Sequence, residues 1–160
     1  MVFSVGEGVL SMFHVTTEPI SIEEVSEKVI RPEAGAVVTF TGTVRELTKG
    51  KRTIELTYEA YASMAEKQLK KIGDEITAQW PDAITAITHR TGTLGISEIA
   101  VVIAVSTPHR KDAYLANEYA IDRIKQIVPI WKKERWEDGE EWIGDQLEKV
   151  PGQPKEDDRV

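Results

Sequence analysis

The chain has 160 residues, no cysteine and a formal net charge of −7 at pH 7, with 41% hydrophobic and 29% charged residues. These values are typical of one globular domain that buries a core without cross-links. The missing cysteines exclude disulfides, thiolate catalysis and thiolate metal ligands, and the acidic charge argues against general nucleic-acid binding. The chain starts with no basic, apolar leader and has no apolar run near the roughly 18 residues that span a bilayer, so we expect a cytoplasmic protein that does not bind membranes.

Apolar spacing and capping residues predict the first elements of the chain. Residues 13–15 are typical of a short strand, and Ser21 begins a helix because its hydroxyl can accept a hydrogen bond from the amide of Glu24. This helix must end before Pro32. Residues 35–45, rich in Val, Thr and Phe, form the next strand.

A polar, glycine-containing turn at residues 48–52 leads into a strand at residues 53–61, and we expect this strand to form a β-hairpin with the preceding one. A second helix spans residues 64–80 and begins with another capping-box pattern, Ser63 with Glu66. Its expected buried face repeats at three- and four-residue steps: Leu69, Ile72, Ile76 and Trp80.

The second half of the chain is predicted to contain two strands, a long helix and a final pair of strands. The strands lie at residues 84–91 and 99–106, and the second is so continuously apolar that we place it in the centre of a sheet. A third helix spans residues 110–127. Residues 130–143 form short strands around a turn at residues 137–139.

The predicted order, β-α-β-β-α-β-β-α-β, indicates an α+β fold with a mixed or antiparallel sheet. We expect a flexible N-terminus at residues 1–12, a single domain at residues 13–150, and a disordered tail at residues 151–160 because that segment is proline-containing and mostly charged.

The sequence STPHR at residues 106–110 is the first candidate for a functional site. A strand leaves the core there, turns at a proline, and is followed by His109 and Arg110 at the start of a helix. Unpaired amides at a helix N-terminus add to positive side chains, so this segment can bind an anion. The alternative is that His109 only caps the helix and Arg110 is solvated.

The end of the same helix and the strand after it supply further cations. Lys125 follows Ile124, which belongs to the buried stripe, so its stem is partly covered while its amine can reach a cleft. The alternative is a lysine that extends into solvent near a helix C-terminus. Lys132 and Lys133 point to opposite faces of a strand, and alternation does not decide which of them joins a pocket.

Other candidates are weaker. Arg45 lies at the end of its strand, a natural rim position, whereas His14 and His89 are isolated in the sequence. No histidines or carboxylates have metal-ligand spacing, and no nucleophile lies beside a base, so we expect no metal. The residues by themselves predict an α+β domain with a basic, anion-binding cluster, and they specify no reaction.

The sequence resembles the molybdopterin synthase large (catalytic) subunit family from about residue 13 to residue 144. Four stretches in the same order carry the resemblance: GAVVTFTGTVR (35–45), LTYEAYASMAEKQL (56–69), STPHRKDAY (106–114) and VPIWKKE (128–134). The resemblance implies an α/β hammerhead-type domain with an added small subdomain. It also implies a sulfurtransferase of molybdenum cofactor biosynthesis that needs no cofactor of its own.

In that family, as the resemblance implies, two large subunits form a homodimer at the core of a heterotetramer. A small sulfur-carrier subunit binds at each end and inserts its C-terminal Gly-Gly tail, which bears a thiocarboxylate. The substrate is precursor Z, a cyclic pyranopterin monophosphate, and two sulfur transfers convert it to molybdopterin. The absence of cysteine is no obstacle, because the carrier supplies the sulfur.

The resemblance also implies the site residues. Lys125 and Lys132 correspond to the two lysines treated as catalytic. The substrate pocket comprises Thr43, Val44, Arg45, His109, Arg110, Lys125, Lys132, Lys133 and Glu134. Cations suit this chemistry because the substrate phosphate and the anionic sulfur must lie close together, and their repulsion is stronger in a partly dry pocket than in water. We expect His109 and Arg110 to bind the phosphate, from the same or the neighbouring subunit.

A second interpretation belongs to another class of protein: a non-enzymatic module that only docks a ubiquitin-like partner or a phosphorylated metabolite. Loss of Lys125 or Lys132 would favour it, and both lysines are present. A purely structural dimerisation domain leaves the His-Arg and Lys-Lys pairs unexplained. The acidic residues Glu140 and Glu141 leave open whether the last segment takes part in carrier binding.

Overall fold

The structure is a computed structural model that describes residues 11–48, 50–137 and 139–145. Most of the expected flexible N-terminus and the whole of the expected tail lie outside these residues. No helix in the described ranges is long and apolar enough to cross a membrane. The elements, in chain order, are β1 (Phe13–Thr16), α1 (Ile22–Glu27), β2 (Ala36–Thr43), β3 (Leu47–Thr48), β4 (Lys51–Ala60), α2 (Ala62–Gln79), β5 (Ile84–Arg90), β6 (Gly92–Gly95), β7 (Ile99–Thr107), α3 (Arg110–Ile127), β8 (Ile130–Trp136) and β9 (Gly139–Asp145).

The first sheet has four strands in the order β1-β5-β7-β2. β1 pairs with β5 in parallel, and the other two pairs are antiparallel, so the sheet is mixed as predicted. β7 lies in the interior of the sheet and is buried over all but its first residue. Its position confirms the prediction from its continuously apolar sequence, since both faces of an interior strand are covered.

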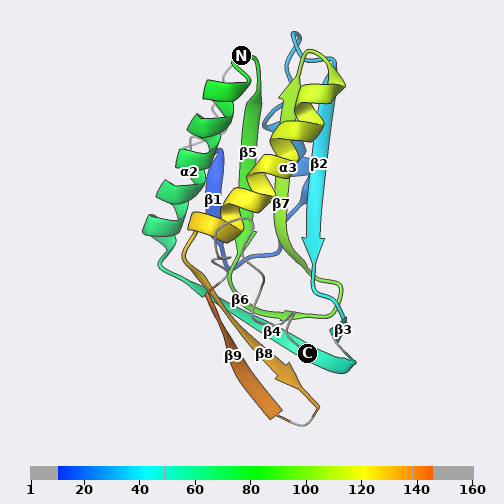
Figure 1. The fold of residues 1–160 in the computed structure, drawn as a ribbon. Helices are drawn as coiled ribbons and strands as arrows, with labels where there is room; N and C mark the ends of the chain where they lie inside the picture. The colour runs from blue at the N-terminus through cyan, green and yellow to red at the C-terminus, as the bar shows by residue number, and fades with distance from the viewer. Residues whose placement is uncertain (1–10, 49, 138, 146–160) are drawn as a thin grey trace.

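Helices cover both faces of this sheet. Ile103 and Val105 of β7 pack in the same core as Leu69 of α2 and Ile124 of α3, whereas the alternate residues Val102 and Ala104 pack with Val25 of α1 and with Val29, just after this helix. This division follows from the two-residue period of a strand. Figure 1 shows α2 and α3 side by side along one face of the sheet.

The second sheet has the strand order β3-β4-β8-β9, with β6 also paired to β4. In Figure 1, β4 crosses the end of the first sheet and the β8–β9 hairpin extends away from it. Leu56 of β4 and Leu94 of β6 are buried and join this sheet to the main core. The fold class is therefore confirmed as mixed α+β, and the second sheet forms the small subdomain.

The predicted hairpin between the strands at residues 35–45 and 53–61 is wrong. β2 pairs with β7, and only the two residues of β3 pair back onto β4 across the turn. The register of β2 shifts between Gly42 and Thr43, where the chain leaves the first sheet for the second. The predicted glycine-containing turn agrees with the φ of +77° at Gly50. A turn, however, does not determine which sheet its flanking strands join.

One of the two predicted helix caps is confirmed. The Ser21 hydroxyl accepts a hydrogen bond from the amide of Glu24 at 3.3 Å. The cap predicted at Ser63 is wrong, because α2 begins earlier and has Tyr61 at its N-cap with no side-chain hydrogen bond. Glu66 instead accepts from the backbone amide of Val15 at 3.1 Å, which ties α2 to β1.

Candidate active site

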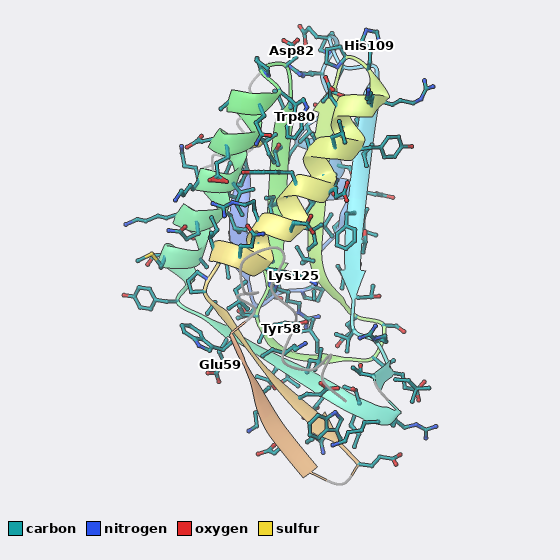
Figure 2. The ribbon with its side chains drawn as sticks, in the orientation of Figure 1. Tyr58, Glu59, Trp80, Asp82, His109 and Lys125 are labelled. Atoms are coloured by element: carbon teal, nitrogen blue, oxygen red, sulfur yellow. The ribbon has the colours of Figure 1, made fainter. Side chains whose placement is uncertain are left out.

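Three cations from three separate elements meet where the two sheets join. Arg45 follows β2, Lys125 lies in the last turn of α3, and Lys132 lies on β8. Burial is the largest cause of the lowered pKa of Lys132, and the positive charges of nearby Lys125 and Arg45 lower it further. These three predicted site residues are therefore brought together. Figure 2 shows Lys125 at the end of α3 nearest the second sheet, with Tyr58 of β4 below it.

Lys132 is the least solvated of the three cations. It is half-buried, while Arg45 and Lys125 are exposed. Burial is the main cause of its lowered pKa, because desolvation disfavours the ammonium form, and the negative charge of Glu134 opposes this effect. An amine in this state releases its proton more readily than a surface lysine does.

Glu134 supplies a buried negative charge on the same face of β8. Residues two apart on a strand share a face, and Glu134 is only 4% exposed. Its carboxylate accepts a hydrogen bond from the hydroxyl of Thr53 on β4. A buried carboxylate needs such partners, and here Glu134 has the hydroxyl of Thr53 as a hydrogen-bond donor and the cation Lys132 on the same face of the strand.

The structure places Lys133 on the opposite face of β8. Its Nζ lies 2.9 Å from Oε1 of Glu140 on β9, and its side chain is 29% exposed. Of the two adjacent lysines, Lys132 is the one that joins the cationic cluster. A contact between Lys133 and the substrate stays a prediction.

The segment from Thr43 to Arg45 is fixed by its middle residue. The Val44 side chain is 2% exposed. Its N–H donates to the carbonyl of Glu98 at 3.0 Å, and its carbonyl accepts from the N–H of Ser97 at 2.8 Å. With its side chain buried and both backbone groups bonded, Val44 anchors the segment and leaves Arg45 exposed at the cluster.

His109 and Arg110 lie at the far end of α3 from this cluster. Fifteen residues separate Arg110 from Lys125 on one helix, which corresponds to roughly 22 Å at 1.5 Å per residue. Figure 2 shows His109 and Lys125 at opposite ends of that helix. His109 is exposed and occupies the N-cap position, but its side chain makes no capping hydrogen bond. One chain therefore does not bring the two halves of the predicted pocket together.

Residue-by-residue reasoning overlooked Thr53 and Tyr58 and gave His89 no role. All three are buried beside the cluster. No clear signal in the sequence pointed to them, because their partners lie far away in the chain: Glu134 for Thr53, and Lys132 and His89 for Tyr58. Within the described residues, no three His, Asp or Glu side chains are grouped as metal ligands.

Comparison with known proteins identifies the family to which this chain belongs. Residues 15–127 match a protein-family model described as MoaE protein. The chain belongs to the MoaE protein family.

Two relatives bear this out, and a third solved structure shares the fold. A protein from Halalkalibacterium halodurans named molybdopterin synthase catalytic subunit is 65% identical over 136 residues, which cover 85% of this chain and 87% of that protein. The crystal structure of molybdopterin synthase from Staphylococcus aureus aligns with a TM-score of 0.82 at 62% identity, over 84% of this chain and 98% of that one. A complex of subunits 1 and 2 of the molybdopterin-converting factor from Helicobacter pylori shares the fold, with a TM-score of 0.69 at 18% identity over 83% of this chain and 90% of that one.

Proposed function

We propose that this protein is the catalytic subunit of a molybdopterin synthase and that it is a sulfurtransferase. It converts precursor Z to molybdopterin by two sulfur transfers from the C-terminal thiocarboxylate of a small carrier subunit. The observation that carries the proposal is the cluster of Arg45, Lys125 and Lys132 over the buried Glu134, in a chain 62–65% identical to proteins of that name.

The cluster suits a reaction that brings two anions together. The substrate phosphate and the carrier's thiocarboxylate repel each other, and Arg45 and Lys125 offset this repulsion at the rim. Lys132 lies deeper, with a pKa lowered mainly by burial. Its amine can stabilise the oxyanion that forms when the acyl–sulfur bond is cleaved, or give a proton to the leaving oxygen as the cyclic phosphate opens.

A second copy of the chain completes the pocket with its His109 and Arg110. β2 is an edge strand in the described part of the first sheet, and Val37 and Phe40 on it are 40% and 38% exposed. An exposed, apolar edge of this kind pairs readily with another strand. Two copies of β2 paired antiparallel about a two-fold axis form one continuous sheet, which buries these side chains.

The same pairing explains how the distant halves of the pocket meet. The N–H of Gly35, next to the start of β2, donates to the carbonyl of Pro108 at 3.2 Å, so His109 lies beside the start of β2. Arg45 lies just beyond the end of β2. Antiparallel pairing sets the start of one β2 against the end of the other, and so sets His109 and Arg110 of one copy near Arg45 of its partner.

The second subunit is a small carrier protein with a C-terminal Gly-Gly thiocarboxylate. The distantly related Helicobacter pylori complex of two subunits supports a two-subunit assembly for this fold. Together with the dimer, this gives a heterotetramer in which each carrier tail reaches one cationic cluster.

The direct test mixes the purified chain with thiocarboxylated carrier and precursor Z and measures molybdopterin. Wild-type protein should form product, and Lys132→Ala should form much less. The competing function is a docking module without activity. It would be supported if the chain bound both the carrier and precursor Z and no molybdopterin appeared.

A further inference from the structure

Tyr58 lies between the two sheets at the base of the cationic cluster. It is directly opposite Lys132 in the antiparallel pairing of β4 with β8. Opposite residues in such a pair share a face and have Cβ atoms about 5 Å apart, so the phenol ring is within reach of the lysine stem. Tyr58 is only 8% exposed, whereas most tyrosines keep their hydroxyl end in solvent.

The other side of the ring contacts the first sheet. His89 of β5 meets it in an edge-to-face arrangement, with ring centroids 5.4 Å apart and ring planes at 77°. Aromatic pairs in this geometry contribute roughly 1 kcal/mol beyond the area they bury. The ring therefore contacts His89 of the first sheet and lies on β4 directly opposite Lys132 of the second sheet.

Both aromatic groups are uncharged near neutral pH. Burial lowers the pKa of His89 to about 4, and its Nδ1 donates to the carbonyl of Arg90 at 2.8 Å, which fixes the tautomer. Burial, assisted by the negative charge of Glu134, raises the pKa of Tyr58 to about 12. Tyr58 and His89 therefore place uncharged rings next to the cluster and add no further positive charge to its three cations.

We infer that Tyr58 is a positioning residue for Lys132: its ring, held between His89 and the lysine stem, keeps water from the stem and directs the amine into the cleft. The inference rests on the proposed function for its effect on turnover. Its effect on Lys132 itself does not depend on that function. The flat ring carries the effect, so phenylalanine can replace tyrosine here and an aliphatic side chain cannot.

The test measures Lys132 directly and turnover separately. Protein labelled with 13C at the lysine ε-carbons is titrated by NMR, and the Lys132 signal is identified by its loss in Lys132→Arg. Tyr58→Leu should raise the pKa of Lys132 toward the ordinary value of 10.5 because water reaches the stem. It should also lower kcat about tenfold with little change in KM, as expected for a displaced catalytic group.

Tyr58→Phe should restore both the titration and most of kcat. Tyr61→Leu, at a tyrosine that is 69% exposed, is the matched control and should leave both unchanged. If Tyr58→Leu does not fold, Tyr58→Met fills the space without a rigid ring and should behave as predicted for leucine.

An unchanged Lys132 titration in folded Tyr58→Leu or Tyr58→Met overturns the inference, whatever happens to turnover. Phenylalanine as damaging as leucine overturns it as well, because the hydroxyl and not the ring would then be responsible. If wild-type protein makes no molybdopterin, the proposed function fails, but the titration still decides the positioning role.

Discussion

A site shared between two copies predicts that two inactive variants restore activity when they are mixed. Lys132→Ala removes a cation of the cluster, and Arg110→Ala removes a cation at the other end of α3. Each variant is inactive or nearly so as a homodimer, because each of its two sites lacks one group. After subunit exchange, a mixed dimer has one site that lacks both groups and one site that lacks neither.

The size of the recovery follows from counting. Random exchange of equal amounts makes half of the dimers mixed, and half of the sites in those dimers are intact, so activity should return to about a quarter of the wild-type value. Loss of the Arg110 contact to phosphate costs about 1.5–3 kcal/mol, or roughly tenfold or more at low substrate concentration. Molybdopterin formation is therefore measured with precursor Z well below its KM, where the background stays below the expected signal.

The matched control mixes Lys125→Ala with Lys132→Ala, whose side chains belong to the same cluster of one chain. No exchange of subunits can combine an intact Lys125 with an intact Lys132 in one site, so this mixture should stay inactive. Native mass spectrometry of differently tagged subunits confirms that mixed dimers form. If mixed dimers form and the mixture of Lys132→Ala with Arg110→Ala stays inactive, the pocket is not shared between two copies. The proposed two-fold pairing of β2 is then refuted as well.

Three further results are expected. Lys125→Ala should lower kcat by roughly a hundredfold or more, and Lys132→Ala should have the next largest effect, because one preorganised donor contributes on the order of 3 kcal/mol. Steady-state kinetics on variants with an unchanged melting temperature test this prediction, and a near wild-type rate refutes it. His89, whose folded pKa of about 4 lies below the ordinary 6.5, takes up a proton later in the folded than in the unfolded state. Stability should therefore fall as the pH drops from 6.5 to 4, and melting curves of His89→Gln should lose that slope. Asn117→Ala should cost about 2 kcal/mol in urea unfolding, because its amide donates to the carbonyls of Val38 at 2.9 Å and Ile103 at 3.0 Å; a loss below half of that would show that α3 does not need this anchor.

Local patterns predicted the helices and the central strand well. The bounds of α3 match the predicted ones. Its apolar positions at three- and four-residue steps are buried at Ala113, Ala116, Ala120 and Ile124, whereas the last of them, Ile127, is half-buried. β7 is the interior strand that its apolar sequence indicated. These features depend on residues three or four apart in a helix, or on both faces of one strand, and such relations are contained in a short segment.

Strand pairing was predicted less well, for a physical reason. The turn before β4 is a genuine local signal, but β4 pairs mainly with β8, some 74 residues away at Tyr58 and Lys132. Pairing partners are chosen by the burial that the whole chain achieves, which a turn sequence does not contain. The two-residue β3 was missed because so short a strand has no periodicity of its own.

The sequence by itself determined the chemistry available to this protein: no thiol, a His-Arg pair at a helix start, and lysines at the end of that helix and on the next strand. It left open which of Lys132 and Lys133 joins a site. In the structure Lys132 lies on the same face of β8 as Glu134, near Arg45 and Lys125, whereas Lys133 forms an ion pair with Glu140. The helix predicted over residues 110–127 already places His109 and Arg110 far from Lys125, because the length of a helix is proportional to its number of residues. Only the tertiary structure showed that Arg45, Lys125 and Lys132 meet where the two sheets join, because pairing between strands far apart in the chain decides which segments become neighbours.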